Sequence, residues 1–260
     1  MTAPAETIRE TASAKVNLYL HVTGRRDDGY HELDSLVVFA GVGDVLTLAA
    51  GAPGAGPSLT ATGPFADALA ETPAEGNLAV RAVHLMAEHF RRAPDVALTL
   101  DKRLPVAAGL GGGSADAAAA MAGLVRLWDL YVPEHSLAEL ALDLGADVPV
   151  CLRGHPAWVG GIGETVAPAP TLPPLWLVLV NPGVPLATPA VFKARTGRFS
   201  APGREAGADA VPDEAHDFAL WLAERRNDLD APARSLEPAV AAAEDALAAT
   251  PDCLLARMSG

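Results

Sequence analysis

Cysteine is scarce in this sequence. The 260 residues include only two cysteines, Cys151 and Cys253, which lie far apart and form no Cys-x-x-Cys pair. This usage argues against a disulfide framework and against a zinc site, and it fits a reducing compartment. We therefore expect a cytoplasmic protein.

Long hydrophobic runs are also missing. No uninterrupted apolar stretch reaches the roughly 18 residues that a membrane helix requires, although 50% of the residues are hydrophobic. The N-terminal stretch MTAPAETIRE has no basic start followed by an apolar core, so we expect no signal peptide and no membrane partner. The length allows one large domain or two modest ones.

Basic residues are outnumbered. The chain has 19 Lys and Arg against 32 Asp and Glu, which gives a formal net charge of −13. Nucleic acid phosphates repel such a chain, so we expect no nucleic-acid partner. An anionic ligand would have to be held locally, by backbone N–H groups or by a few placed cations.

Hydrophobic periodicity predicts an α+β protein. Strands are predicted over residues 8–24, 33–40, 44–50, 96–100, 147–154, 156–164 and 176–183. Helices are predicted over residues 78–90 (capped by Asn77), 114–130, 136–145, 214–224 and 236–248. Residues 51–75 are predicted to form a surface connection, residues 167–175 a proline-dense boundary and residues 200–213 a mobile connection.

The stretch LPVAAGLGGGSADAAAAM, residues 104–121, concentrates four glycines in five positions. A dinucleotide fingerprint fails because Ser114 and Asp116 stand where its last glycine would be. A P-loop fails for lack of a lysine, and a hydrolase elbow around Ser114 fails because Asp116 is not glycine. With these three motifs excluded, the stretch is left as a strand followed by a glycine turn, a serine and a helix.

That arrangement has a physical use. The first N–H groups of a helix lack internal partners, and glycines allow the backbone to approach phosphate oxygens closely. Ser114 adds a hydroxyl, either as helix cap or as a contact to phosphate or Mg²⁺. A turn that only permits close packing is the alternative, and spacing alone leaves both open.

The same stretch resembles the PxxxGLGxSSxxxAA nucleotide-binding motif of the GHMP kinases (galactose, homoserine, mevalonate and phosphomevalonate kinases). Further stretches resemble one branch of them, the 4-diphosphocytidyl-2-C-methyl-D-erythritol kinases. They are SAKVNLYLHVTGRRDDGYHELDSL, GADVPVCLRG with GGIGE, and NPGVPLATPAVFK. The resemblance covers nearly the whole chain, in the family's order.

The resemblance implies transfer of the ATP γ-phosphate to the 2-hydroxyl of 4-diphosphocytidyl-2-C-methyl-D-erythritol, a step of non-mevalonate isoprenoid synthesis. Mg²⁺ is expected to arrive with ATP, because the triphosphate needs a counter-cation. One alternative is a GHMP kinase that acts on homoserine or a mevalonate compound. Another is a nucleotide-binding protein without catalysis.

The resemblance also implies a two-domain GHMP kinase fold. Residues 1–169 would form the nucleotide-binding domain, similar to the ribosomal S5 domain 2-like fold, and residues 170–260 a ferredoxin-like domain. Active-site residues would line the cleft between the domains. We expect a monomer or a weak homodimer.

Two residues match the family's catalytic pair. Asp147 would accept the alcohol proton, and Lys15 would stabilise the developing charge. Without the resemblance, Asp147 would be read as a turn or helix-end aspartate and Lys15 as an ordinary solvated lysine. The expected ATP cradle consists of Pro105, Val106, Ala107, Ala108, Gly109, Leu110, Gly111, Gly112, Gly113, Ser114 and Ala115.

Five residues match the family's substrate site. Tyr30 would stack on the cytosine, His31 would bond its edge, and Phe192 would lie on the other side of the ring. Asn17 would hydrogen-bond the substrate, and Thr188 would supply a hydroxyl. Without the resemblance, Phe192 would be assigned to the core.

The chain departs from the family pattern at two places, and no resident metal is expected. Ala115 stands where a second serine is usual. The last residues, CLLARMSG, look like the start of a third glycine-rich motif, so we expect a truncated chain or a sequence that lacks its tail. His84 and His89 lie five positions apart, whereas a helical zinc pair is spaced by four.

Overall fold

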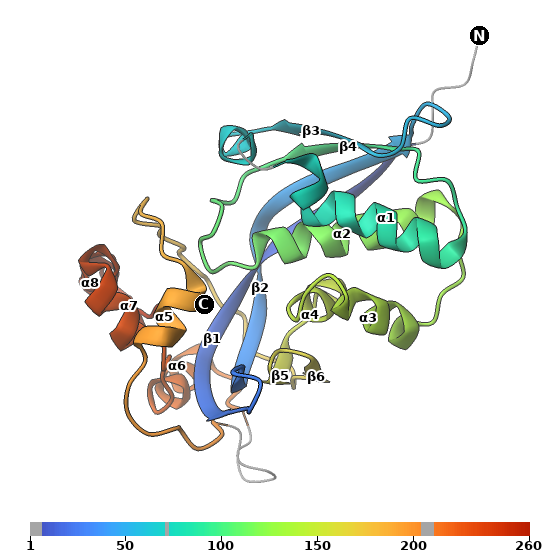
Figure 1. Cartoon of the computed structure of the whole chain (residues 1–260). Coiled ribbons are helices and arrows are strands. Elements are labelled where there is room, and N and C mark those ends of the chain that lie inside the picture. Colours follow the sequence, from blue (N-terminus) through green and yellow to red (C-terminus); the bar gives the residue numbers. More distant parts are fainter. Residues whose placement is uncertain (1–6, 71–72, 204–210) are drawn as a thin grey trace. The chain divides into compact units, whose positions relative to one another are not determined.

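A computed structural model describes residues 7–70, 73–203 and 211–260, and Figure 1 shows its course. The expected absence of a signal peptide rests partly on residues 1–6, and residues 204–210 are half of the predicted mobile connection over 200–213. Both lie outside the described residues. Two compact units are present: Met1–Lys15, Ala40–Val106 and Gly111–Gly154 form unit 1, and Val16–Phe39, Ala107–Leu110 and His155–Gly260 form unit 2. The division of domains at residue 169 stays a prediction.

Two long strands supply residues to both units. β1 (Thr7–Arg25) confirms the strand predicted from alternation. β2 (His31–Ala50) joins the two strands predicted over 33–40 and 44–50 into one. The glycines between them do not end the strand, because Gly43 lies directly against the backbone of Ala12 in β1, where a side chain would not fit.

Unit 1 contains a sheet in the order β3-β4-β2, and β1 also pairs with β2. β4 (Val96–Asp101) is antiparallel to β2, with Val45 opposite Asp101. β3 (Ser58–Thr62) is parallel to β4. The surface connection predicted over 51–75 is therefore wrong in part: its alternating SLTAT run completes the sheet, and the 3-10 helices η1 (Ala66–Leu69) and η2 (Ala74–Gly76) follow.

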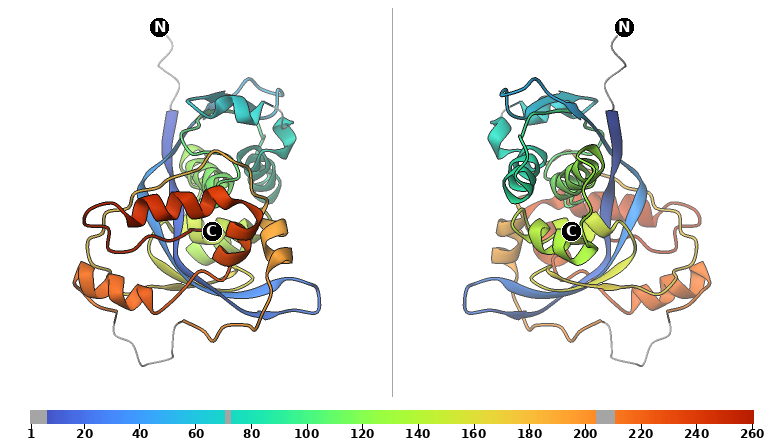
Figure 2. Two further views of the ribbon diagram at one scale, coloured as in Figure 1. Left: turned by 90° about the vertical axis from the view of Figure 1, so that its left-hand side faces the viewer. Right: turned by 90° about the vertical axis from the view of Figure 1, so that its right-hand side faces the viewer.

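Helices cover one face of this sheet (Figure 1). α1 (Leu78–Phe90) and α2 (Gly112–Leu127) lie side by side and are seen nearly end-on in both views of Figure 2. Asn77 caps α1 as predicted, accepting a hydrogen bond from the Ala79 N–H at 2.9 Å. All the alanines of α2 except Ala122 are buried, which lets α2 approach the sheet and α1 closely.

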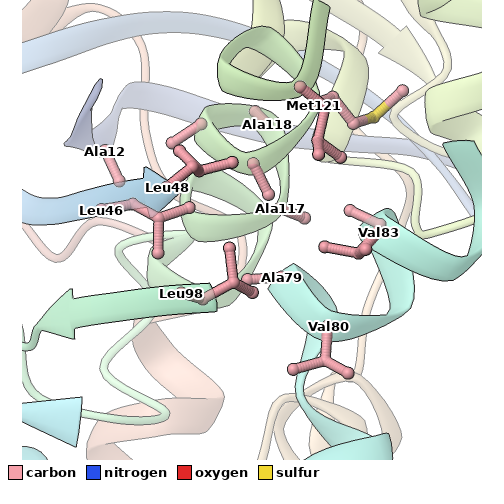
Figure 3. Close-up of a cluster of buried hydrophobic side chains, with 14 of the residues drawn as sticks. Ala12, Leu46, Leu48, Ala79, Val80, Val83, Leu98, Ala117, Ala118 and Met121 are labelled. Carbon is pink, nitrogen blue, oxygen red and sulfur yellow. The ribbon is translucent and has the colours of Figure 1, made fainter. Parts of the chain in front are cut away.

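The core of unit 1 is assembled from these layers. Figure 3 shows Leu46, Leu48 and Leu98 of the sheet facing Val83 of α1 and Met121 of α2. Each of these five side chains is at most 1% exposed. Their burial fixes the sheet and both helices, and with them the glycine loop that enters α2.

The strand predicted over 147–154 is wrong. Those residues form α4 (Val148–Arg153), which follows α3 (Glu134–Leu142). Pro149 lies in the first turn, where its missing N–H costs nothing, and Gly154 ends the helix with a left-handed φ of 64°. A short apolar run has no decisive period, so these end signals outweigh it.

Unit 2 continues the pairing from β2 to β5 (Ala157–Gly161) and β6 (Thr165–Pro168), both antiparallel. α6 (Ala215–Ala223) and α8 (Pro238–Ala248) confirm two predicted helices. α5 (Thr188–Ala194) and α7 (Asp230–Leu236) were not predicted as helices. The α+β class is confirmed. Among described residues 170–203 and 211–260, the regular elements are these four helices, so the sheet expected for a ferredoxin-like domain is not seen there.

The buried strand predicted over 176–183 is wrong. Those residues carry no regular structure, and Trp176 and Val178 are 101% and 73% exposed. A β-prone run becomes a strand only beside a partner that takes its hydrogen bonds. Among the described residues, no helix has the length and apolar character needed to cross a membrane.

Candidate active site

Lys15 and Asp147 form an ion pair within unit 1. The Lys15 Nζ lies 3.0 Å from the Asp147 Oδ1, although 132 positions separate the two residues. The Lys15 side chain is 7% exposed and that of Asp147 is 41% exposed. A buried cation therefore holds a carboxylate that solvent or a substrate can still reach.

The start of α2, at the end of the glycine-rich loop, lies beside Lys15. Gly111 precedes the first residue of α2 with a left-handed φ of 63°. A side chain there would lie 3.1 Å from the Cβ of Lys15. The first N–H groups of α2 have no partner inside the helix, and in the described structure no side chain caps them. These donors therefore lie next to the ion pair.

The rest of the loop also contains left-handed backbone. Ala107 and Gly109 have φ values of 55° and 70°. Gly109 contacts the chain's last described segment, since a Cβ on it would lie 2.9 Å from the Ser259 O. The Ser259 Oγ accepts a hydrogen bond from the Asn17 N–H at 3.0 Å. In unit 2, the start of the predicted third motif therefore lies against the loop and against β1.

The predicted aromatic residues come together in part. The rings of His31 and Phe192 stack with centroids 4.9 Å apart and an interplanar angle of 24°. Tyr30, which immediately precedes β2, is 62% exposed. Thr188 begins α5 and is exposed, and Asn17 is buried on β1.

Two pKa shifts bear on the chemistry. Burial lowers the pKa of His31, and the charges of Arg25 and Arg195 lower it further. The His31 ring is therefore neutral near pH 7 and can both donate and accept a hydrogen bond. Burial raises the pKa of the Cys151 thiol to about 12, so Cys151 stays protonated and is a poor nucleophile.

Ala115 explains one departure from the family motif. It is 3% exposed and belongs to the core of unit 1. A hydroxyl at this position would point among apolar side chains. The alanine therefore fits the surrounding core, and Ser114, which is partly exposed, keeps the hydroxyl at the helix start.

Three buried charged residues behind the loop escaped the sequence analysis: Asp44, Lys102 and Asp116. Burial lowers the pKa of Lys102, but the carboxylates of Asp116 and Asp44 outweigh it and raise that pKa overall. Burial also raises the pKa of Asp116 to about 7 against the opposing charge of Lys102. Asp116 within an apolar alanine run was the available signal, because an unpaired aspartate is rarely buried.

A metal-binding cluster is not formed by the described side chains: nowhere among them do three His, Cys, Asp or Glu residues gather closely enough to hold an ion.

Comparison with known proteins places these features in a family. The family model "GHMP kinases N terminal domain" matches residues 77–155. The 4-diphosphocytidyl-2-C-methyl-D-erythritol kinase of Paramagnetospirillum magneticum is 56% identical over 252 residues, 96% of this chain and 84% of that protein. The protein of the same name from Rhodospirillum rubrum is 51% identical over 256 residues, 98% of this chain and 82% of that protein.

Solved structures agree. A crystal structure of 4-(cytidine 5'-diphospho)-2C-methyl-D-erythritol kinase matches with a TM-score of 0.66 and 33% identity, over 93% of this chain and 83% of that one. Homoserine kinase from Cytophaga hutchinsonii matches with a TM-score of 0.63 and 17% identity, over 95% of this chain and 80% of that one. The second match indicates a shared fold alone.

Proposed function

The chain belongs to the 4-diphosphocytidyl-2-C-methyl-D-erythritol kinases of the GHMP superfamily, and from this membership we propose how its residues carry the reaction. It is a small-molecule kinase that uses ATP. The proposed acceptor is the 2-hydroxyl of the cytidyl substrate, in non-mevalonate isoprenoid synthesis.

The observation that carries the mechanism is the Lys15–Asp147 pair beside the start of α2. The Asp147 carboxylate accepts the proton of the attacking hydroxyl. Lys15 orients that carboxylate and stabilises negative charge that develops on the reacting oxygens. Lys15 and Asp147 also hold the attacking hydroxyl in position for the γ-phosphate. Such positioning is a large part of phosphoryl-transfer catalysis.

The loop of residues 105–115 holds the triphosphate. Left-handed residues Ala107, Gly109 and Gly111 turn the backbone so that it can approach phosphate oxygens, and the first N–H groups of α2 donate to them. The Ser114 hydroxyl adds a contact there. Mg²⁺ enters with ATP and neutralises phosphate charge when bound, so a resident metal site is not required.

Residues of unit 2 recognise the cytidyl group. The exposed ring of Tyr30 offers a face for stacking on the base. The neutral His31 ring bonds the base edge, and Phe192, whose ring stacks on that of His31, lies on the other side of the base from Tyr30. The backbone of Asn17 is held by Ser259, and its side-chain amide hydrogen-bonds the substrate, while Thr188 supplies a hydroxyl.

We also propose a cytoplasmic location and a monomer or weak homodimer. Both cysteines are free thiols, which suits a reducing compartment.

ADP release from MgATP tests the function. The protein is assayed with 4-diphosphocytidyl-2-C-methyl-D-erythritol, with mevalonate and with homoserine. The expected result is ADP formation that depends on the cytidyl compound alone. ADP formation only with mevalonate or homoserine would identify another GHMP kinase activity. ATP binding without turnover on any of the three would identify a catalytically silent protein.

A further inference from the structure

Behind the glycine loop, unit 1 encloses a buried cation between two carboxylates. The Lys102 Nζ lies 2.5 Å from the Asp44 Oδ2 and 2.8 Å from the Asp116 Oδ2. Lys102, Asp44 and Asp116 are 2%, 0% and 3% exposed. We call these three residues the Lys102 clamp.

The clamp joins the three elements that border the loop. Asp44 lies in β2, Lys102 directly follows β4, and Asp116 lies in the first turns of α2. The second oxygen of Asp44 accepts from the backbone N–H groups of Arg103 and Leu104, at 2.6 and 2.8 Å. The chain entering the loop and the helix leaving it are therefore both tied to one ammonium.

The clamp also sits directly against the helix start. A side chain on Gly112, the first residue of α2, would lie 3.2 Å from the Lys102 Nζ. A Cβ on Gly112 would crowd the ammonium, which would have to shift by a few tenths of an ångström. The first turns of α2 therefore adjoin Lys102 at Gly112 and are bonded to it through Asp116.

Such a cluster is an expensive way to gain stability. Three ionisable side chains are removed from water, and the Asp116 Oδ1 has no hydrogen-bond partner among the described residues. Apolar residues would fill the same volume with less desolvation cost. The cluster instead fixes geometry, because charge-assisted hydrogen bonds are directional and hold their partners in one arrangement.

We propose that the Lys102 clamp positions the phosphate-binding N–H groups, so that Lys102, Asp44 and Asp116 act as positioning residues for ATP. This inference rests on the proposed role of the loop as the triphosphate cradle. It assigns the clamp to ATP binding rather than to binding of the phosphoryl acceptor.

MgATP binding by isothermal titration calorimetry tests the clamp without requiring turnover. Asp116→Ala removes one of the two carboxylates that bind Lys102. We expect the Kd for MgATP to rise at least tenfold, which corresponds to about 1.4 kcal/mol. Asp116→Asn keeps an oxygen that can accept from Lys102, and we expect a Kd within about twofold of the wild type. If Asp116→Ala does not fold, Asp116→Ser, one bond too short to reach Lys102, replaces it with the same expectation.

Glu244→Ala in unit 2 is the matched control. Glu244 is also a buried carboxylate, 7% exposed, that pairs with an arginine and keeps one unpartnered oxygen among the described residues. It should lower the melting temperature and leave the Kd for MgATP unchanged. The inference is overturned if Asp116→Ala or its serine replacement binds MgATP like the wild type, if asparagine fails to rescue, or if Glu244→Ala weakens binding equally. Wild-type binding of MgATP without turnover of the cytidyl substrate would instead refute the proposed function and leave the clamp standing.

Discussion

Asp147 combines two properties that a catalytic base needs. Its carboxylate is oriented by Lys15 at 3.0 Å, and 41% of its side chain is exposed. Because asparagine keeps the shape and loses the basic oxygen, Asp147→Asn should lower kcat by about 10²–10⁴-fold. The Kd for MgATP should stay within about twofold. Steady-state kinetics and calorimetry on the same preparation check both values.

A parallel loss of kcat and ATP binding in Asp147→Asn would contradict this role. It would mark Asp147 as a structural partner of Lys15, whose removal disturbs the start of α2.

Tyr30 has an exposed ring, and exposure alone does not assign a role. If Tyr30 stacks on the cytosine, Tyr30→Ala removes about 1–3 kcal/mol of binding. We expect the KM for the cytidyl substrate to rise by about 5- to 150-fold, with the KM for ATP unchanged. Tyr131→Ala is the control, because Tyr131 is 99% exposed and has no assigned function. An unchanged KM for the cytidyl substrate in Tyr30→Ala would exclude stacking.

The loop and α2 act together as one element. Gly111 combines a left-handed φ of 63° with contact to Lys15, where a Cβ would lie 3.2 Å from the Cε. Gly111→Ala should therefore strain the backbone by about 1–2 kcal/mol and also displace Lys15 from Asp147. We expect kcat to fall at least tenfold, as measured by ADP release.

Gly54→Ala separates the two effects. Gly54 has a similar φ of 76°, but a Cβ on it would meet no other atom of the described residues within 4 Å. It should show the loss of melting temperature without the loss of kcat. Equal kcat losses in the two variants would mean that strain, and not the position of Lys15, controls the rate.

The stability of the whole chain should depend on pH through Asp228. Burial raises the pKa of Asp228, but hydrogen bonds from Ser200, Arg226 and the Val22 N–H, with the Arg226 charge, outweigh burial and lower it overall. Because the pKa is lower in the folded state, the charged Asp228 stabilises the protein at pH values above the ordinary aspartate pKa of about 4. This contribution is lost as the pH falls through the folded-state pKa.

Asp228→Asn should consequently melt at a lower temperature than the wild type at pH 7. The difference in melting temperature should shrink as the pH falls below about 4 and should vanish below the lowered folded-state pKa of Asp228, where both side chains are neutral. Calorimetric scans between pH 3 and 7 measure the difference. A difference that stays constant over this range would show that the charge of Asp228 does not contribute.

The sequence by itself determined much of this protein. Alternation predicted β1, although β1 is buried on both faces over residues 14–22, and helical patterns predicted α1 and α2. The glycine loop and the stretches around Lys15, Tyr30, Asp147 and Phe192 indicated the family. Those signals are local, so they survive without knowledge of the fold.

Tertiary structure decided what depends on neighbours distant in sequence. Lys15 meets Asp147 across 132 positions, and Lys102 meets Asp44 and Asp116 from three different elements. Residues 58–62 form a strand because β4 offers them hydrogen bonds, whereas the more apolar residues 176–183 carry no regular structure. Strand pairing and the burial of charge are stabilised only by contacts between residues that folding brings together. A local sequence pattern does not indicate those contacts.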